Sequence, residues 1–170
     1  MANTYTLIEA KTLASNTASV SFTSIPSTYT DLMLLVSART IRATYSDDSA
    51  AITFNGSTTS YSSKFLEGNG ASASSYSGGS TNVSLYLPAD GAATANTFGN
   101  LSIYIPNYAG SAYKSFSSDV VMETNATTAY MTLTAGLWSN TAAINQITVT
   151  GVFANLKTNS TFYLYGIKNS

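Results

Sequence analysis

Two chemically versatile residues are absent from this chain of 170 residues, which has no cysteine and no histidine. Without cysteine there can be no disulfide bond and no thiol chemistry, and the usual zinc sites lose their thiolate ligands. Without histidine the chain cannot build a Ser-His-Asp triad or supply an imidazole base, and it lacks the commonest metal ligand. Several large classes of enzyme are therefore excluded.

Charge is also scarce, because only 9% of the residues are charged and the formal net charge is −1. An ordinary soluble domain has roughly 25% charged residues. The basic residues are scattered, so we expect no nucleic-acid partner; they are Lys11, Arg39, Arg42, Lys64, Lys114, Lys157 and Lys168. A net charge near zero favours association. We therefore expect a chain that packs against copies of itself or against a shell formed by another protein.

Long hydrophobic runs are missing as well. No apolar run approaches the length of about 18 residues that a membrane span needs. Residues 1–15 lack a basic segment followed by an apolar core, so we expect no signal peptide. The chain contains instead 26 serines and 25 threonines, whose hydroxyl groups supply solubility. A composition rich in threonine and poor in glutamate and lysine favours strands over helices.

Apolar and polar residues alternate with a period of two along most of the chain, which is typical of strands with one buried face. The expected strands are Thr4–Lys11, Ser19–Thr23, Asp31–Ile41, Ala50–Phe54, Tyr61–Glu67, Asn82–Leu87, Phe98–Ile105, Ser115–Glu123, Ala129–Trp138, Ile144–Phe153 and Ser160–Ile167. Asn55-Gly56 supplies a tight hairpin turn, and Gly68–Ser80 is predicted as a long loop. The pattern predicts an all-β fold in a single domain, residues 1–170: a two-sheet antiparallel β-sandwich, jelly-roll-like, of about ten strands.

The segment Ile25–Arg39 is expected to organise this sandwich. Leu32, Leu34 and Val36 alternate with Met33 and Leu35, so both faces of the segment are apolar. A short run that is apolar on both faces indicates a central strand covered on both sides.

Three short motifs resemble functional ones, and we weigh each against a simpler explanation. Ser111–Lys114 matches the Ser-x-x-Lys nucleophile signature, but that chemistry needs a helix start, whereas a turn into a strand is expected here. Gly68–Ala73 resembles a dinucleotide-binding loop without the helix that must follow. Asp47-Asp48 could bind calcium, but no EF-hand spacing surrounds it and a solvated turn is the simpler reading.

A glycosidase would need two facing carboxylates, which only the fold can bring together. The candidates are Glu9, Glu67, Asp90, Asp119 and Glu123. None of these motifs is convincing, and we expect no catalytic, cofactor-binding or metal-binding residues.

Tyrosine is the most abundant aromatic residue, with 12 copies against 7 of phenylalanine and one of tryptophan. Five tyrosines fall on the expected outward face of strands: Tyr86, Tyr104, Tyr130, Tyr163 and Tyr165. They suit cross-strand stabilisation of a sheet, a wet protein interface or a sugar-binding face, and these three readings stay open. Trp138 is expected to fill the core or a subunit contact.

Four segments together resemble a group of small structural proteins of tailed bacteriophages, particularly those of aquatic hosts: Phe22–Leu32, Ile105–Tyr108, Leu137–Asn145 and Phe153–Ile167. The ending Leu164-Tyr165-Gly166-Ile167 is the most specific of them, and the similarity extends from Thr4 to Lys168. The resemblance implies a jelly-roll-like module on the virion surface, as capsid decoration or cement protein, head fibre or tail-appendage domain. It implies no catalytic residues.

Among those roles we expect capsid decoration, because the chain shows no repeats of the kind that form a tail-fibre shaft. The expected partners are the chain itself, as a homotrimer, and the major capsid protein or another virion protein. Many weak contacts give strong avidity when copies are linked. Two alternatives remain: a receptor- or glycan-binding appendage that uses exposed tyrosines and Gly68–Ser80, and a depolymerase that uses paired carboxylates.

Overall fold

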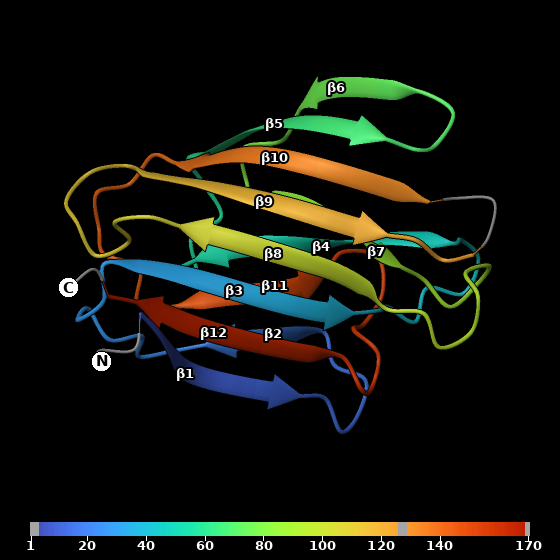
Figure 1. Ribbon diagram of the computed structural model, residues 1–170, viewed down its shortest axis with the longest axis horizontal. Coiled ribbons are helices and arrows are strands. Elements are labelled where there is room, and N and C mark those ends of the chain that lie inside the picture. Colours follow the sequence, from blue (N-terminus) through green and yellow to red (C-terminus); the bar gives the residue numbers. More distant parts are fainter. Residues whose placement is uncertain (1–3, 126–128, 169–170) are drawn as a thin grey trace.

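The computed structural model describes residues 4–125 and 129–168, so residues 1–3, 126–128 and 169–170 of the expected domain lie outside it. The described residues form twelve strands in two antiparallel sheets, one of eight strands and one of four. Figure 1 shows the larger sheet in front of the smaller one. The prediction of an all-β, two-sheet antiparallel sandwich is confirmed. No helix that could cross a membrane occurs in the described part of the chain.

Eight of the strands pair as a nested set, as in a long hairpin folded over on itself. In the large sheet β1 (Tyr5–Thr12) pairs with β12 (Thr161–Ile167), and β3 (Asp31–Ala38) pairs with β8 (Gly99–Ile105). In the small sheet β2 (Ser19–Phe22) pairs with β11 (Ile147–Gly151), and β4 (Asp47–Phe54) pairs with β7 (Val83–Pro88). The resulting orders β1-β12-β3-β8 and β2-β11-β4-β7 are those of a jelly roll.

Two inserted hairpins extend the large sheet beyond β8. One consists of β5 (Tyr61–Gly68) and β6 (Ala73–Ser77), and the other of β9 (Lys114–Met122) and β10 (Tyr130–Trp138). They continue the sheet in the order β8-β9-β10-β5-β6 (Figure 1). Only four strands form the opposite sheet of the described residues, and its edge strand β7 contacts β8, β9, β10 and β5.

The expected loop Gly68–Ser80 was wrong in its middle, where β6 lies. All five residues of β6 are exposed, so the strand has no buried face to produce an alternating pattern. With this edge strand the described residues have twelve strands, against eleven expected segments and a predicted total of about ten. The backbone of β6 pairs with β5, and Asn69 accepts hydrogen bonds from the backbone N–H of Ala71 (3.0 Å) and Ser72 (2.8 Å) in the turn between them.

The core lies between the two sheets and extends under the inserted strands β5, β9 and β10. It includes Leu32, Leu34 and Val36 of β3, all buried, and β3 pairs with a strand on each side as expected. The expected cover on both faces was wrong, however: Met33 is half-buried and Leu35 is 39% exposed. Within the described residues, no further element packs over the outer face of this sheet, so its apolar side chains face solvent.

The polarity of β10 is the reverse of what its pattern suggests. Thr132 and Thr134 are buried, while Met131 and Leu133 point away from the core and are exposed. Tyr130 lies on the inward side with the threonines, so its predicted outward position was wrong. Periodicity separates the two faces of a strand but does not say which one meets the core.

Candidate functional site

The outer face of β9, β10 and β5 carries a cluster of exposed apolar side chains. Met131 is 61% exposed, Leu66 is 55% exposed and Leu133 is 53% exposed. Register places Leu133 opposite Leu66, and Met131 opposite Val121 of β9. We call this cluster the outer patch and define it as Leu66, Val121, Met131, Leu133 and Ala135. Single exposed apolar residues are common on proteins, whereas large contiguous groups are typical of interaction surfaces.

Shallow hollows lie on both sides of Leu133. One of about 430 Å³ is lined by residues that include Leu66, Ser117, Leu133 and Ala135. A second, of about 230 Å³, lies between Leu66, Met131, Leu133 and Ala73. The outer patch therefore has both protruding leucines and recesses into which apolar side chains of another protein can fit.

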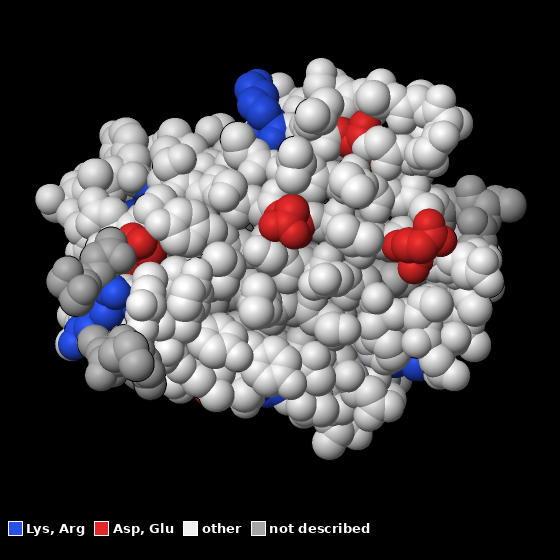
Figure 2. All heavy atoms as spheres, viewed as in Figure 1, with Lys and Arg blue, Asp and Glu red and all other residues white. Residues whose placement is uncertain are grey.

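Two opposite charges flank the outer patch. Lys64 is the register partner of Ala135 on β5, and Asp119 is the register partner of Leu133 on β9. They stand on opposite sides of β10, so the patch is positive along one margin and negative along the other. Figure 2 shows this face of the molecule, on which the charged side chains are few and separated by wide uncharged areas.

A second apolar area lies on the same face over β1, β12 and β3. Leu7 pairs with Tyr165, and Tyr163 pairs with Leu35. The rings of Tyr5 and Tyr165 meet edge to face at 6.5 Å. The strands between this area and the outer patch present Ser102, Ser117 and Asp119, so polar side chains separate the two.

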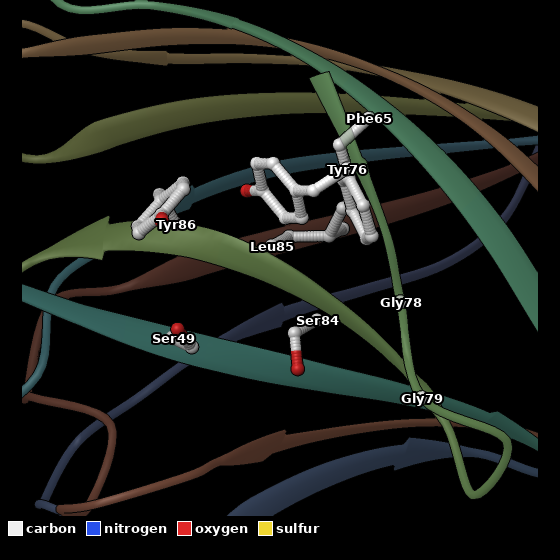
Figure 3. Close-up of a pocket in the computed structure, with 8 residues that line it drawn as sticks. All are labelled: Ser49, Phe65, Tyr76, Gly78, Gly79, Ser84, Leu85 and Tyr86. Atoms are coloured by element: carbon white, nitrogen blue, oxygen red, sulfur yellow. The ribbon is translucent and has the colours of Figure 1, made fainter. Parts of the chain in front are cut away.

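A different kind of recess lies where the β5–β6 hairpin meets the edge of the small sheet. It measures about 200 Å³ and is lined by Ser49, Phe65, Tyr76, Gly78, Gly79, Ser84, Leu85 and Tyr86. We call it the tyrosine hollow. Figure 3 shows the rings of Phe65, Tyr76 and Tyr86 on one side of it and Ser49 and Ser84 on the other.

Ring stacking fixes the walls of the tyrosine hollow. Tyr76 stacks on Phe65 with ring centres 4.9 Å apart, and Tyr86 stacks on Tyr130 at 4.7 Å. The Tyr76 hydroxyl donates a hydrogen bond to Glu67 Oε2 at 3.0 Å. Burial, with hydrogen bonds to Tyr86 and Glu67, raises the pKa of Tyr76, and burial also raises the pKa of Tyr86. Both hydroxyl groups therefore remain protonated in neutral solution.

Buried hydroxyl groups gather on the inner face of the inserted strands. Ser63, Ser118, Thr132 and Thr134 each have a buried oxygen with no hydrogen-bond partner among the described residues, and Trp138 Nε1 shares this property. Ser118 and Thr134 are register partners. A buried hydroxyl without a partner costs about 1–3 kcal/mol, so this part of the sandwich is less stable than an apolar core.

The structure separates the two residues of the Ser-x-x-Lys motif. Ser111 is exposed in a turn, whereas Lys114 begins β9 and is buried. The Lys114 ammonium group donates to the backbone carbonyls of Gly110, Ala112 and Thr141. Burial lowers the pKa of Lys114, but the three carbonyl groups solvate the charged form. The lysine thus joins the turns before β9 and after β10.

The five candidate carboxylates are not gathered into one site. Glu9 pairs with Lys11 at 2.9 Å, and Glu123 accepts a hydrogen bond from the backbone of Asn125 at 2.7 Å. Glu67 and Asp119 point to opposite faces of the large sheet, because Glu67 neighbours the outward Leu66, which is level with Asp119.

Asp90 belongs to an ionic cluster in which Arg39 is buried, while Asp90 and Lys157 are partly exposed. Its Oδ1 accepts hydrogen bonds from Arg39 Nε (2.6 Å) and Lys157 Nζ (2.7 Å). Burial acts to raise the pKa of Asp90, but the hydrogen bonds from Lys157 and Arg39 outweigh it and lower this pKa. Arg39 is 1% exposed and also donates to four carbonyl oxygens between residues 89 and 97. The cluster fixes the segment after β7.

The predicted solvated turn at Asp47-Asp48 was wrong, since both residues lie in β4 and Asp48 is buried. Asp48 Oδ1 accepts hydrogen bonds from the backbone N–H of Ser49 (2.6 Å) and Phe153 (3.3 Å). The described residues contain no group of three or more side chains that could hold a metal ion. Gly68–Ala73, the dinucleotide-like segment, spans the end of β5, the turn that follows and the start of β6.

The remaining aromatic candidates divide between the core and the outer face. Tyr163 and Tyr165 lie on the outer face as predicted, and the Tyr104 hydroxyl donates to Asp31 Oδ2 at 2.8 Å. Trp138 fills the core, against Tyr61 and Phe54. Sequence reasoning named Tyr86 and the segment Gly68–Ser80, which contains Tyr76 and Gly79, as a possible sugar-binding surface. It missed Phe65, Ser49 and Ser84, because these residues lie on strands far apart in the sequence. No sequence signal could have joined them.

Comparison with known proteins adds no relative. No protein-family model matches the chain, and no curated protein matches it significantly.

Proposed function

We propose that this chain is a non-enzymatic structural protein of the virion surface of a tailed bacteriophage, with capsid decoration or cement as its role. In this role it associates with copies of itself and docks on the capsid shell to stabilise it. The observation that carries the proposal is the outer patch, where a strand presents its apolar face to solvent and buries its threonines.

An exposed apolar patch is unfavourable for an isolated chain, because it leaves hydrophobic surface in water. Burial against a partner recovers about 25 cal/mol for each Å² of apolar surface removed from water. The surface also carries little charge, so docking involves little desolvation of ionised groups. Both properties support a protein whose task is to be bound.

The proposed partners are a second and third copy of the chain and the major capsid protein or another virion protein. The outer patch suits contact between copies, since it has leucines, recesses and one charge of each sign. The area over β1, β12 and β3 is then left for the shell. Copies linked in a trimer bind the shell with far greater avidity than one copy does.

The test measures the solution mass of the purified chain by light scattering, beside the variant Leu133→Asp. We expect a trimer for the parent chain and a monomer for the variant. Leu7→Asp, on the same face but distant from the outer patch, is the matched control and should keep the trimer. A parent chain with the mass of one copy contradicts self-association, and a mass of two copies contradicts the trimer.

Docking is tested separately, by cryo-electron microscopy of capsids incubated with the parent chain and with both variants. We expect added density at shell junctions for the parent chain and its loss with Leu7→Asp. Bare capsids after incubation with the parent chain contradict the decoration role, whatever the mass of the free protein.

A second candidate function is recognition of a host receptor or glycan by a head or tail appendage. The tyrosine hollow favours it, since aromatic rings and hydroxyl groups converge there. Deletion of the gene tests it: a receptor-binding role predicts loss of adsorption to host cells, whereas a decoration role predicts normal adsorption and heads of reduced stability.

A further inference from the structure

We propose that the tyrosine hollow is a binding site for one neutral pyranose ring, as found at the end or in the chain of a surface polysaccharide. The inference extends the second candidate function, and it does not depend on self-association or on docking at the shell. It rests on the ring faces, polar groups, charge and size of the hollow.

The ring of Tyr76 supplies the platform. One face of this ring is stacked on Phe65, which holds it in place, and the side chain is 40% exposed. Tyr86 is held in the same way by its stack on Tyr130. The apolar face of a sugar ring packs on such aromatic rings, and their immobilisation before binding reduces the entropy lost on association.

Polar groups surround this platform at positions suited to the hydroxyl groups of a sugar. Ser49 and Ser84 project on the side opposite the rings (Figure 3), and the Tyr76 hydroxyl points toward Tyr86 beside the Glu67 carboxylate. Hydroxyl groups both donate and accept, whereas a carboxylate accepts only. A ligand that carries several hydroxyl groups can form hydrogen bonds with all of these side chains.

Charge restricts the class of ligand further. Of the described residues that line the hollow, none is lysine or arginine, and the Glu67 carboxylate accepts a hydrogen bond from the Tyr76 hydroxyl. A phosphate or a uronic acid would meet like charge there without a cation to pair with. Binding of an anion is therefore disfavoured, and a neutral ligand is favoured.

The size of the hollow restricts the ligand to a single sugar ring. The hollow measures about 200 Å³, below the roughly 300–1,000 Å³ typical of sites for drug-sized ligands. The backbone of Gly78 and Gly79 forms one wall. A Cβ at Gly78 would lie 2.0 Å from Ser63 Oγ, while a Cβ at Gly79 would meet no atom within 4 Å. A side chain at position 79, on the lining of the hollow, is therefore accommodated without a clash.

The experiment titrates the full chain with neutral methyl pyranosides and N-acetylglucosamine, observed by saturation-transfer NMR. Glucuronate and choline serve as anionic and cationic probes of similar size. Three variants address the hollow: Tyr76→Ala removes the platform, Tyr76→Phe keeps the ring without its hydroxyl, and Gly79→Leu fills space. Tyr113→Ala, an exposed tyrosine outside the hollow, is the matched control.

We expect at least one neutral sugar to bind, with affinity lowered about tenfold by Tyr76→Ala and Gly79→Leu. Tyr76→Phe should have a smaller effect, and Tyr113→Ala should have none. Thermal unfolding of each variant separates loss of the site from loss of the fold. Preferential binding of choline or glucuronate overturns the assignment to a neutral sugar. No binding of any probe by the folded parent chain, or binding unchanged in both Tyr76→Ala and Gly79→Leu, overturns the site itself.

Discussion

Leu133 of β10 lies opposite Leu66 of β5, and both side chains point to solvent rather than into the sandwich. The inward neighbour Thr134 is buried, and its hydroxyl has no partner among the described residues. In the isolated chain, the middle of β10 therefore buries threonines and exposes apolar side chains. Such a strand is stabilised by a partner that covers the exposed face, which is why the outer patch is central to the proposed function.

The first prediction concerns the charges that flank the outer patch. Contact between copies should bring Asp119 of one chain near Lys64 of the next. Asp119→Lys or Lys64→Asp alone places like charges together and should weaken self-association by about tenfold or more. The double variant Lys64→Asp/Asp119→Lys exchanges the two charges and should restore it. Sedimentation velocity at low ionic strength measures each case, since salt screens such pairs.

A matched control uses charges on the same chain outside the patch. Glu9→Lys should leave the association constant unchanged, because Glu9 lies on β1 and pairs with Lys11. If both single variants associate as strongly as the parent chain, or if the double variant stays weak, then Lys64 and Asp119 do not meet across the interface.

The second prediction concerns the unpaired hydroxyl of Thr134. Thr134→Val replaces this group by a methyl group of similar size, so the unfavourable burial of a polar atom is removed. The free energy of unfolding should rise by about 1 kcal/mol. Thr148→Val is the control, because the Thr148 hydroxyl hydrogen-bonds with Ser21 Oγ at 2.9 Å and its loss should lower stability. Urea denaturation measures both, and a less stable Thr134→Val would indicate that a bound water satisfies this hydroxyl.

Much of the fold could be predicted from the pattern of the sequence. Strands such as β9 and β12 alternate cleanly, and Phe116, Val120, Phe162 and Leu164 point inward as their period requires. The missing helical period and the high threonine content pointed to the correct class. Alternation is a local property, so it is readable wherever one face of a strand meets the core.

Other features depend on the partners of a strand and were not predictable. Nothing in Tyr130–Trp138 indicates that β10 faces β7, the edge strand of the second sheet, with its threonines turned inward. The exposed edge strand β6 has no pattern at all. The tyrosine hollow joins Phe65, Tyr76 and Tyr86 from three strands, and only the way the inserted hairpin meets β7 brings them together.

The third prediction concerns the stability of the fold at acidic pH. The pKa of Asp90 is lower in the folded chain than its ordinary value of 3.8, so the unfolded chain takes up this proton first as the pH falls. The stability due to ionised Asp90 is therefore present above about pH 4 and is lost as the pH falls through the lowered pKa. Asp90→Asn should lower the free energy of unfolding at neutral pH by about 1–3 kcal/mol. It should also flatten the acid side of the pH profile.

The free energy of unfolding, measured from neutral pH to pH 3, checks the role of Asp90, and Glu9→Gln is the control. Glu9 forms an exposed pair with Lys11, so its loss should change stability by less than about 1 kcal/mol. Equal acid slopes for the parent chain and Asp90→Asn would show that other carboxylates govern the acid transition.

The fourth prediction tests the packing of the inserted strands at a glycine. Gly136 of β10 is the register partner of Phe116 on β9, and a Cβ there would lie 2.3 Å from the Phe116 ring. The ring also packs against Phe54 of the small sheet, with centres 5.3 Å apart, so it cannot move freely. Gly136→Ala should therefore destabilise the fold by about 1–3 kcal/mol. Gly79→Ala is the control, because its Cβ meets no atom within 4 Å, and its unfolding midpoint in urea should match that of the parent chain. If Gly136→Ala is as stable as this control, β9 and β10 are held to the small sheet less tightly than the ring contacts indicate.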